Sequence, residues 1–353
     1  MNPEIQPPVL KNGQTERVVP FQSGDGFPCN LLNIRGPTPP TRGPVLLVPG
    51  AGVRANIFRA PVPITIVDYL VARGYDVWLE NWRASIDFPP NAWTLDEAAL
   101  YDHPQAVKTI VRETGATRVK AIIHCQGSTS FTMSALAGLV PEVDVIVSNA
   151  VSLHTVVPKF SSLKLNFALP FISLVTPYLN PHWGVYAPTL PAKFISLMVA
   201  LVHHECHNPV CKQVSFTYGS GFPALWLHEN LSEATHEWVK QEFAEVPVSF
   251  FKQMAACVRR GHLVSVSGSP ELPADFTAAP PKTAARFALF SGQQNLCFLP
   301  ESQSRSFDYF NSHQKNFHSL NFINHYSHLD MFMGQNAARD VFPRMAAELE
   351  RAN

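Results

Sequence analysis

A thiol stands where an apolar stretch of the sequence turns into a helical one. The apolar, β-branched segment 119–123 runs directly into His124, Cys125, Gln126 and Gly127. A strand that turns sharply into a helix at a nucleophilic side chain, with glycine two residues later, is the nucleophile elbow usually written G-x-S-x-G. The turn exposes the nucleophile, and the helix N-terminus behind it favours a thiolate. The pattern therefore predicts Cys125 as a nucleophile.

This elbow departs from the usual pattern at two positions. Cys125 takes the place of serine, and Ile123 takes the place of the first glycine. Two alternatives stay open on the residues alone. Cys125 is only a small buried hydrophobe at a strand end, or Ser128 is the nucleophile, although Ser128 falls inside the expected helix and not on the turn.

The elements around the elbow alternate between strand and helix. Two short strands are expected first, at 17–21 and 29–34. Apolar runs and helical patterns then alternate, with strands at 44–48, 76–79, 119–123, 143–147, 286–290 and 317–323 and helices at 64–73, 95–114, 128–136 and 336–351. This alternation predicts an α/β fold with a mostly parallel central sheet flanked by helices and joined by right-handed crossovers.

The alternation is interrupted once. Between residues 153 and 285 the chain is rich in proline, histidine and aromatic residues and shows no strand–helix rhythm. We therefore divide the chain into an N-terminal part of the core (1–152), a lid or cap domain (153–285) and a C-terminal part of the core (286–353). An insertion between core strands is expected to cover the carboxyl edge of the sheet, where open α/β folds bind ligands.

Composition excludes several classes of partner. Lys+Arg and Asp+Glu are both 27, so the formal net charge is zero, and no basic footprint for a nucleic acid is present. The apolar runs are too short for a membrane-spanning helix, so no membrane insertion is expected. The start of the chain, 1–8, lacks the apolar region of a signal peptide. We expect a cytoplasmic protein with six free cysteines and leave its oligomeric state open.

Four motifs, in their order, resemble the α/β-hydrolase superfamily and in particular its acid lipase branch. They are Gly-Tyr-Asp-Val-Trp-Leu at 74–79, Tyr-Asp-His-Pro at 101–104, the elbow, and His-Leu-Asp-Met at 328–331. The chain is still more similar to the hydrolase-like domain found alongside oxidoreductases of the glucose–methanol–choline type, which include cholesterol oxidases, where the elbow also tends to carry cysteine. The polyhydroxyalkanoate synthases, again with cysteine on the elbow, are more distant relatives.

The resemblance implies a role for each member of a triad. Cys125 matches the nucleophile and His328 the general base. The acid should follow the strand that ends at Phe290, where acid lipases read Gly-Gly-Asn-Asp and this chain reads Gly-Gln-Gln-Asn, so Asn295 takes the orienting position. A thiol can rest as a thiolate beside an imidazolium, so a neutral asparagine is enough to orient the ring. The resemblance thus implies a Cys-His-Asn triad.

Other residues remain candidates for the same roles. His325 is the second choice as base, because only His328 lies in the matching motif. Asp308 or Asp330 would replace Asn295 as the acid, although Asp330 is too close to His328 in sequence to reach its ring easily. A decayed triad in a non-catalytic pocket is also open.

The oxyanion hole is expected from two backbone N–H groups. One belongs to Gln126, after the nucleophile, and the other to Ala51 in the loop 49–53. Gly50 and Gly52 would let the backbone approach the substrate closely. An ordinary tight turn after a strand would look the same.

The lid contains two polar clusters that attract attention. His228 and His236 could reach the substrate, although a helix N-cap at Ser232 explains part of that pattern. The run 203–211 looks like a metal site, but its C-x4-C spacing is not a standard zinc arrangement and no second ligand pair follows. We expect a turn or a local thiol pair there, with no metal and no cofactor.

These observations predict an acyl-transfer enzyme. Cys125 would take an acyl group from a hydrophobic ester or thioester and pass it to a small nucleophile or to water, as an acyltransferase, thioesterase or hydrolase does. Two alternatives belong to other classes: a non-catalytic binding module for a hydrophobic ligand, and a partner protein of an oxidoreductase.

Overall fold

An eight-stranded, mostly parallel sheet forms the centre of the molecule. The computed structural model describes residues 10–11 and 13–351, so the segment 1–8 considered for a signal peptide lies outside the described residues. The strand order is β1-β2-β4-β3-β5-β6-β9-β10, in which only the β1–β2 and β2–β4 pairs are antiparallel. The strands are β1 (Thr15–Gln22), β2 (Pro28–Arg35), β3 (Pro44–Val48), β4 (Asp76–Asn81), β5 (Val119–His124), β6 (Val143–Asn149), β9 (Arg286–Gly292) and β10 (Ser319–Ile323).

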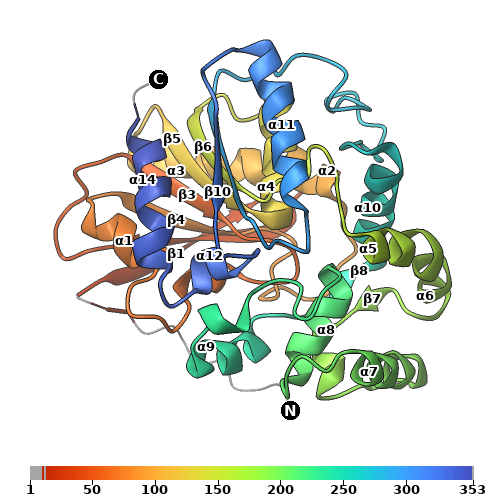
Figure 1. The fold of residues 1–353 in the computed structure, drawn as a ribbon. Helices are drawn as coiled ribbons and strands as arrows, with labels where there is room; N and C mark the ends of the chain where they lie inside the picture. The colour runs from red at the N-terminus through yellow and green to blue at the C-terminus, as the bar shows by residue number, and fades with distance from the viewer. Residues whose placement is uncertain (1–9, 12, 352–353) are drawn as a thin grey trace.

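Helices cover both faces of this sheet, as the apolar strands require. Every residue of β3, β4 and β9 is buried, which is the pattern of parallel strands covered on both sides. Helices α1 (Ile66–Ala72) and α14 (Phe342–Glu350) contact each other beside the sheet, α3 (His103–Thr114) contacts α4 (Cys125–Leu136), and α11 (Pro300–His313) packs on β9 and β10 (Figure 1). The predicted fold class is confirmed.

Some helix boundaries differ from the expected ones. Helix α4 begins at Cys125 and not at 128. The expected helix 95–114 consists of α2 (Leu95–Glu97), the π-helical turn η2 (Ala98–Asp102) and α3. The terminal helix is divided into α13 (Ala337–Asp340) and α14, with proline in the first turn of α14. Proline has no N–H to continue a preceding helix but fits the first turn of a new one.

The segment between β6 and β9 is mainly helical. It contains α5 (Lys159–Leu163), η3 (Lys164–Ala168), α6 (Leu169–Val175), η4 (Pro181–Gly184), α7 (Leu190–Val202), α8 (Pro209–Tyr218), η5 (His228–Asn230), α9 (Glu233–Trp238), η6 (Val239–Gln241) and α10 (Val248–Arg260), with one short antiparallel pair, β7 (Tyr178–Leu179) and β8 (Val246–Pro247). We call this segment the lid; its expected limits, 153 and 285, remain a prediction.

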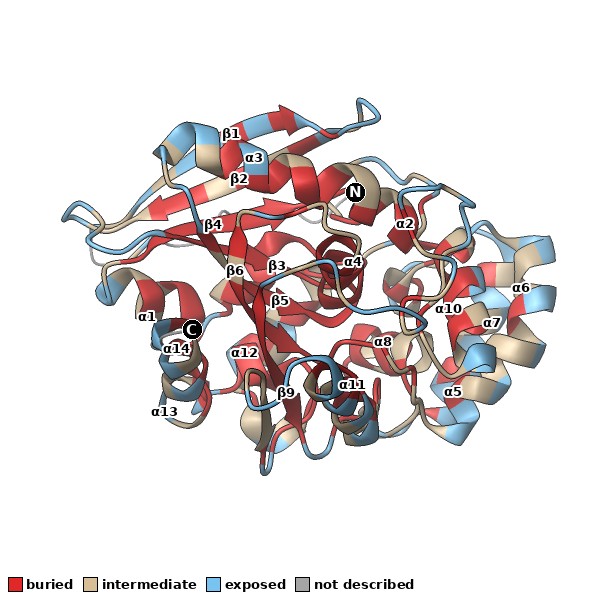
Figure 2. Cartoon of the chain, turned by 90° about the horizontal axis from the view of Figure 1, so that it is seen from above, coloured by how far each residue is buried: buried red, intermediate tan, exposed pale blue. Residues whose placement is uncertain are grey.

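The outer helices of the lid carry many exposed apolar side chains. Figure 2 shows the central strands as buried and much of α5, α6 and α7 as intermediate or exposed. The exposed apolar residues on α5–α7 and η3 are Phe160, Leu163, Phe167, Phe171, Leu174, Val175, Leu190, Phe194, Leu197, Met198, Leu201 and Val202. Within the described residues, no helix is long and apolar enough to cross a membrane.

Candidate active site

Cys125 lies on a strained turn between β5 and α4. Its φ is +56°, in the left-handed region that non-glycine residues rarely adopt. Gly127 is needed two residues later, because a Cβ there would lie 2.0 Å from the carbonyl oxygen of Pro49. Ile123, in the place of the first glycine, is buried in β5. The turn therefore has the backbone geometry of a nucleophile elbow.

The loop after β10 brings His328 to Cys125. His328 lies between β10 and α12 (Asp330–Met333) and is 1% exposed. The Cys125 Sγ and a ring nitrogen each of His328 and His124 lie within 4.8 Å of one another. The His124 and His328 rings also pack together, with their centroids 4.6 Å apart. The nucleophile and base suggested by the resemblance are thus neighbours in the fold.

Asn295 meets His328 through its amide nitrogen. Asn295 Nδ2 lies 3.0 Å from His328 Nδ1. Its other amide atom, Oδ1, accepts the backbone N–H groups of Cys297 at 3.0 Å and Phe298 at 3.1 Å. These two donors fix the amide orientation, because turning the amide over would place its N–H groups against them. The residue at the acid position therefore donates to the histidine.

The direction of the Asn295–His328 hydrogen bond determines which ring nitrogen of His328 carries the proton. Since Asn295 donates to Nδ1, neutral His328 must hold its hydrogen on Nε2. The Nε2 atom is buried and has no hydrogen-bond partner. An imidazolium would set two donors, Nδ1–H and the Asn295 amide, against each other. The rest state expected from the sequence, a thiolate beside an imidazolium oriented by an oxygen, does not match this arrangement.

The surroundings of Cys125 favour its thiolate. Burial raises the pKa of the Cys125 thiol, but hydrogen bonding to the Cys297 thiol and to the Gln126 N–H holds that pKa well below its ordinary value. Cys297 is the thiol that keeps its proton in this pair, since the neighbouring Cys125 and burial raise its pKa. The position of Cys125 at the start of α4 acts in the same direction.

Sequence reasoning missed Tyr218 and Cys297. Tyr218 ends α8, lines the space beside Cys125, and has a buried hydroxyl without a hydrogen-bond partner. Burial, with the negative charge of the Cys125 thiolate, raises the pKa of Tyr218, so its hydroxyl keeps its proton and stays a donor. No local sequence pattern marks this tyrosine. Cys297, in contrast, follows Asn295 by two residues, and a thiol so close to the orienting residue could have been predicted as part of the site.

The other candidates for the nucleophile, base and acid are either exposed or hydrogen-bonded to other groups. Ser128 is buried within α4 and bonds Ser148 through its hydroxyl at 2.7 Å. His325 is exposed. Asp308 is an exposed residue of α11. Asp330 accepts the N–H groups of Ser327 and Leu227 and the Asn230 amide, so it holds the loop that carries His328 and does not contact the ring by a hydrogen bond.

The loop after β3 forms the other side of the elbow. Gly50 and Ala51 line a small hollow together with Cys125 and His328. A Cβ on Gly50 would lie 3.0 Å from the Cys125 Cβ. Gly52 does not line this hollow: its N–H bonds the Ala84 carbonyl, and a Cβ there would lie 2.3 Å from the Tyr218 hydroxyl oxygen. The Gln126 N–H interacts with Cys125. Ala51 and Gln126 therefore both flank the thiol, as an oxyanion hole requires.

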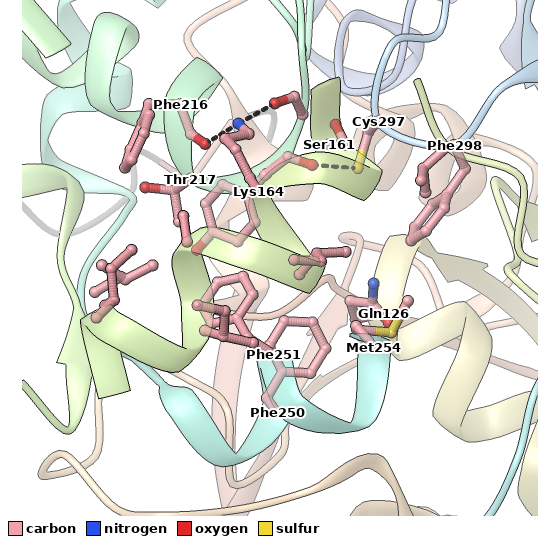
Figure 3. A pocket seen from close by; sticks show the side chains of 18 of the residues that line it. Gln126, Ser161, Lys164, Phe216, Thr217, Phe250, Phe251, Met254, Cys297 and Phe298 are labelled. Carbon is pink, nitrogen blue, oxygen red and sulfur yellow. Dashed lines mark hydrogen bonds between the residues drawn. The ribbon is translucent and has the colours of Figure 1, made fainter. Parts of the chain in front are cut away.

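A largely apolar cavity opens at Cys125. It holds about 750 Å³ not filled by protein atoms, counting the part open to solvent, and Figure 3 shows its wall. The wall consists of residues at the elbow, residues of the loop after β9, and lid residues mainly from η3, α6, α8 and α10. Its apolar members include Leu165, Ile172, Phe216, Phe250, Phe251, Met254 and Phe298. An apolar wall of this kind suits a hydrophobic ligand.

One cation lines this cavity. Lys164 donates from Nζ to the carbonyl oxygens of Phe216 and Gly219, at the end of α8. Burial lowers the Lys164 pKa to about 8. Since two carbonyls already take its N–H groups, Lys164 closes the C-terminal end of α8.

His228 and His236 do not line the cavity at Cys125. They lie instead beside Cys206 and Cys211 in the lid. Their expected contact with the substrate has no support in this geometry.

A second serine–histidine–carboxylate arrangement has a structural role. His103 lies 2.7 Å from the Ser130 hydroxyl through Nε2 and 2.9 Å from Glu80 through Nδ1. All three residues are completely buried, and none lines a described cavity. They join β4, α3 and α4 behind the elbow.

Comparison with known sequences finds lipases. The chain is 23% identical over 328 residues to lipase member K of Homo sapiens, covering 87% of this chain and 79% of that protein. A shorter stretch of 97 residues is 33% identical to gastric triacylglycerol lipase of Rattus norvegicus, covering 24% of this chain and 25% of that one. No family model matches the chain.

Comparison with solved structures gives the same fold. A thermophilic esterase from Thermogutta terrifontis superposes with a TM-score of 0.55 at 12% identity, covering 95% of this chain and 98% of that one. An epoxide hydrolase from Vigna radiata gives 0.58 at 13% identity, covering 96% and 98%. Together with the strand order and the elbow, these likenesses show that the chain has the fold of the α/β-hydrolases.

Proposed function

We propose that this chain is an acyl-transfer enzyme of the esterase and lipase type that works through an acyl-Cys125 intermediate. The similarity to lipase member K supports the general class. The observation that carries the proposal is the thiol itself, which lies on a strained elbow, beside a histidine, at the end of an apolar cavity.

The first step needs no proton transfer when the substrate is a thioester. The Cys125 thiolate attacks the acyl carbonyl, a C–S bond forms to Sγ, and the bond to the leaving sulfur breaks as the thiolate departs with the electron pair. The Gln126 and Ala51 N–H groups and the Tyr218 hydroxyl are placed to donate to the transient oxyanion. The His328 Nε2–H is placed to donate to Cys125 Sγ or to the leaving sulfur.

An oxygen ester makes a heavier demand on His328. Its alkoxide leaving group needs a proton from a general acid in the transition state. If His328 gave up its Nε2 proton, it would become an imidazolate, because Nδ1 carries no proton in this arrangement. We therefore favour hydrophobic thioesters over oxygen esters as acyl donors.

The same argument bears on the acceptor. A thiol acceptor can attack the acyl-Cys125 intermediate as a thiolate and expel Sγ, whereas water must lose a proton to a base during attack. His328 in this tautomer has no free lone pair on Nε2. Transfer to another thiol is therefore favoured over hydrolysis.

A non-catalytic role is the second candidate. The direction of the Asn295–His328 hydrogen bond also suits a site in which His328 no longer acts as a base. The cavity would then bind a hydrophobic ligand without reaction. A partnership with an oxidoreductase remains a prediction from the resemblance alone, as does a cytoplasmic location.

Parallel kinetics on two substrate series test this proposal. Acyl-coenzyme A thioesters and p-nitrophenyl esters of matched chain length are offered, with a small thiol as acyl acceptor, to the wild-type chain and to Cys125→Ala. We expect higher kcat/KM for the thioesters, with all turnover lost in the variant. Ligand binding without turnover in either series would favour the binding module.

A further inference from the structure

Four metal-binding side chains meet in the lid, away from the elbow. Cys206 lies in the loop between α7 and α8, Cys211 in the first turn of α8, His228 in η5 and His236 in α9. One ligand atom from each lies within 4.8 Å of the other three. We propose that these four side chains bind one zinc ion.

The geometry fits a tetrahedral ion. With a Zn–S distance of ~2.3 Å and a Zn–N distance of ~2.05 Å, a tetrahedral angle places a bound sulfur and a bound nitrogen about 3.6 Å apart. The Cys211 Sγ and His228 Nε2 atoms are 3.5 Å apart. The His228 and His236 rings meet edge to face, with centroids at 4.8 Å, so both can turn a nitrogen to one point.

An unpaired atom points to a missing ligand. The His236 Nε2 is buried and has no hydrogen-bond partner. A buried polar atom without a partner carries a cost of about 1–3 kcal/mol unless something satisfies it. A metal ion at the centre of the cluster would satisfy it.

The surroundings hold the ligands in place. Asn208 accepts the Val210 and Cys211 N–H groups through Oδ1, at 3.0 and 3.1 Å. Its Nδ2 donates to the His236 carbonyl oxygen at 2.6 Å. Asn208 therefore joins the segments that supply two of the ligands, as outer-shell residues do around metal sites.

The donor set selects zinc and a structural role. Two thiolates and two imidazoles are a common set for structural zinc, and two thiolate charges neutralise the charge of the ion. Four protein ligands leave no open position for water or substrate, which separates a structural site from a catalytic one. The site joins the α7–α8 loop to α8, η5 and α9 and so would stabilise the lid.

The proposed zinc site departs from the sequence-based expectation of no metal, and the reason lies in the spacing of the ligands. The second ligand pair does follow the Cys206–Cys211 pair, but it stands far along the chain and has no fixed motif spacing. The inference is independent of the acyl-transfer proposal, because none of the four residues lines the cavity at Cys125.

Metal analysis of the full chain tests this inference. After expression with added zinc, we expect about one zinc per chain, with at least a ten-fold loss of bound zinc in Cys211→Ser and in His236→Gln. Cys257→Ser is the matched control, since Cys257 is a buried thiol in α10 outside the cluster. Cys125→Ser tests the other group of possible ligands, His124, Cys125 and His328, and should keep its zinc.

Cobalt substitution tests the site in the wild-type chain and so does not depend on whether the variants fold. Wild-type chain depleted of zinc and loaded with Co²⁺ should show the strong visible bands of tetrahedral cobalt and a thiolate-to-cobalt charge-transfer band. Weak, octahedral-type bands would overturn the proposal. So would a zinc-free wild-type chain, a Cys206–Cys211 disulfide in its place, or zinc lost in Cys125→Ser but kept in Cys211→Ser.

Discussion

Asn295 determines what His328 is able to do. In a serine triad the acid accepts a hydrogen bond from the imidazole, which leaves Nε2 free to take the proton of the nucleophile. Here the amide nitrogen faces Nδ1, because Oδ1 is held by two backbone N–H groups. The substitution of the nucleophile by cysteine and of the acid by asparagine is therefore consistent with chemistry that starts from a thiolate and avoids a general base.

Changing Asn295 to aspartate should reverse this polarity. In Asn295→Asp one carboxylate oxygen keeps the backbone N–H groups and the other accepts His328 Nδ1–H, which frees Nε2 as a base. We expect kcat/KM for oxygen esters to rise by about ten-fold or more relative to thioesters. The double variant Cys125→Ser/Asn295→Asp should exceed Cys125→Ser alone in p-nitrophenyl ester hydrolysis. An unchanged ratio of the two substrate classes would refute the tautomer assignment.

The buried Tyr218 hydroxyl should contribute to acylation. It has no partner in the fold and stays protonated, so it is available to donate to an oxyanion at the elbow. Tyr218→Phe removes only the hydroxyl and should slow acylation about 10²-fold with little change in KM. Stopped-flow acylation with an acyl thioester measures this directly. A rise in KM with an unchanged acylation rate would show that the hydroxyl only binds substrate.

Helix α4 can pack closely against the loop after β3 only because residue 127 is glycine. A Cβ at position 127 would meet the Pro49 carbonyl oxygen at 2.0 Å, and a backbone atom cannot move aside cheaply. Gly127→Ala should therefore destabilise the fold by about 3 kcal/mol or more. Gly43→Ala is the control, since a Cβ there meets nothing within 4 Å. Urea unfolding compares the two, and equal stabilities would show that the turn tolerates a side chain.

The core was readable from the sequence, whereas the lid was not. Runs such as 44–48 and 286–290 carry strong apolar patterns because parallel strands are buried on both faces. Helices of the lid such as α6 have apolar residues on both sides, one lining the cavity and one exposed. Because both faces of such a helix are apolar, the sequence lacks the 3.6-residue hydrophobic period from which a helix is predicted.

The candidate site was readable in part for a related reason. Cys125, His328 and Asn295 each follow or precede a core strand, so their positions in the sequence follow from the fold. Tyr218 and the four proposed zinc ligands come from lid segments whose packing has no sequence signature. The direction of the Asn295 amide depends on two backbone N–H groups from the following loop, which no sequence pattern specifies.

Stability should fall in mild acid because several histidines are buried in neutral form. His318 shows this best: its Nδ1 accepts the Phe287 N–H at 3.0 Å, and burial, aided by Arg286, lowers its pKa to about 4. The unfolded chain takes up this proton near pH 6.5, before the folded chain does. The contribution is therefore complete above about pH 6.5 and is lost as the pH falls towards 4.

Replacing this histidine should reduce the loss. His318→Gln keeps an acceptor for the Phe287 N–H but does not titrate. Between pH 7 and 4.5, its unfolding free energy should fall by about 1–2 kcal/mol less than that of the wild-type chain, after allowance for partial exposure of the ring. Urea unfolding at both pH values measures this difference, with His325→Gln as the exposed control. Identical acid losses in all three proteins would contradict the assignment.

The central claim is that Cys125 carries the acyl group, and intact-protein mass spectrometry tests it most directly. The wild-type chain and Cys125→Ala are each exposed to a panel of acyl thioesters of increasing chain length, with folding checked by circular dichroism. The account predicts one acyl mass per wild-type chain, mapped to Cys125 and prevented by prior treatment with iodoacetamide, and no adduct on the variant. Acylation of Cys125→Ala at the wild-type rate would contradict it.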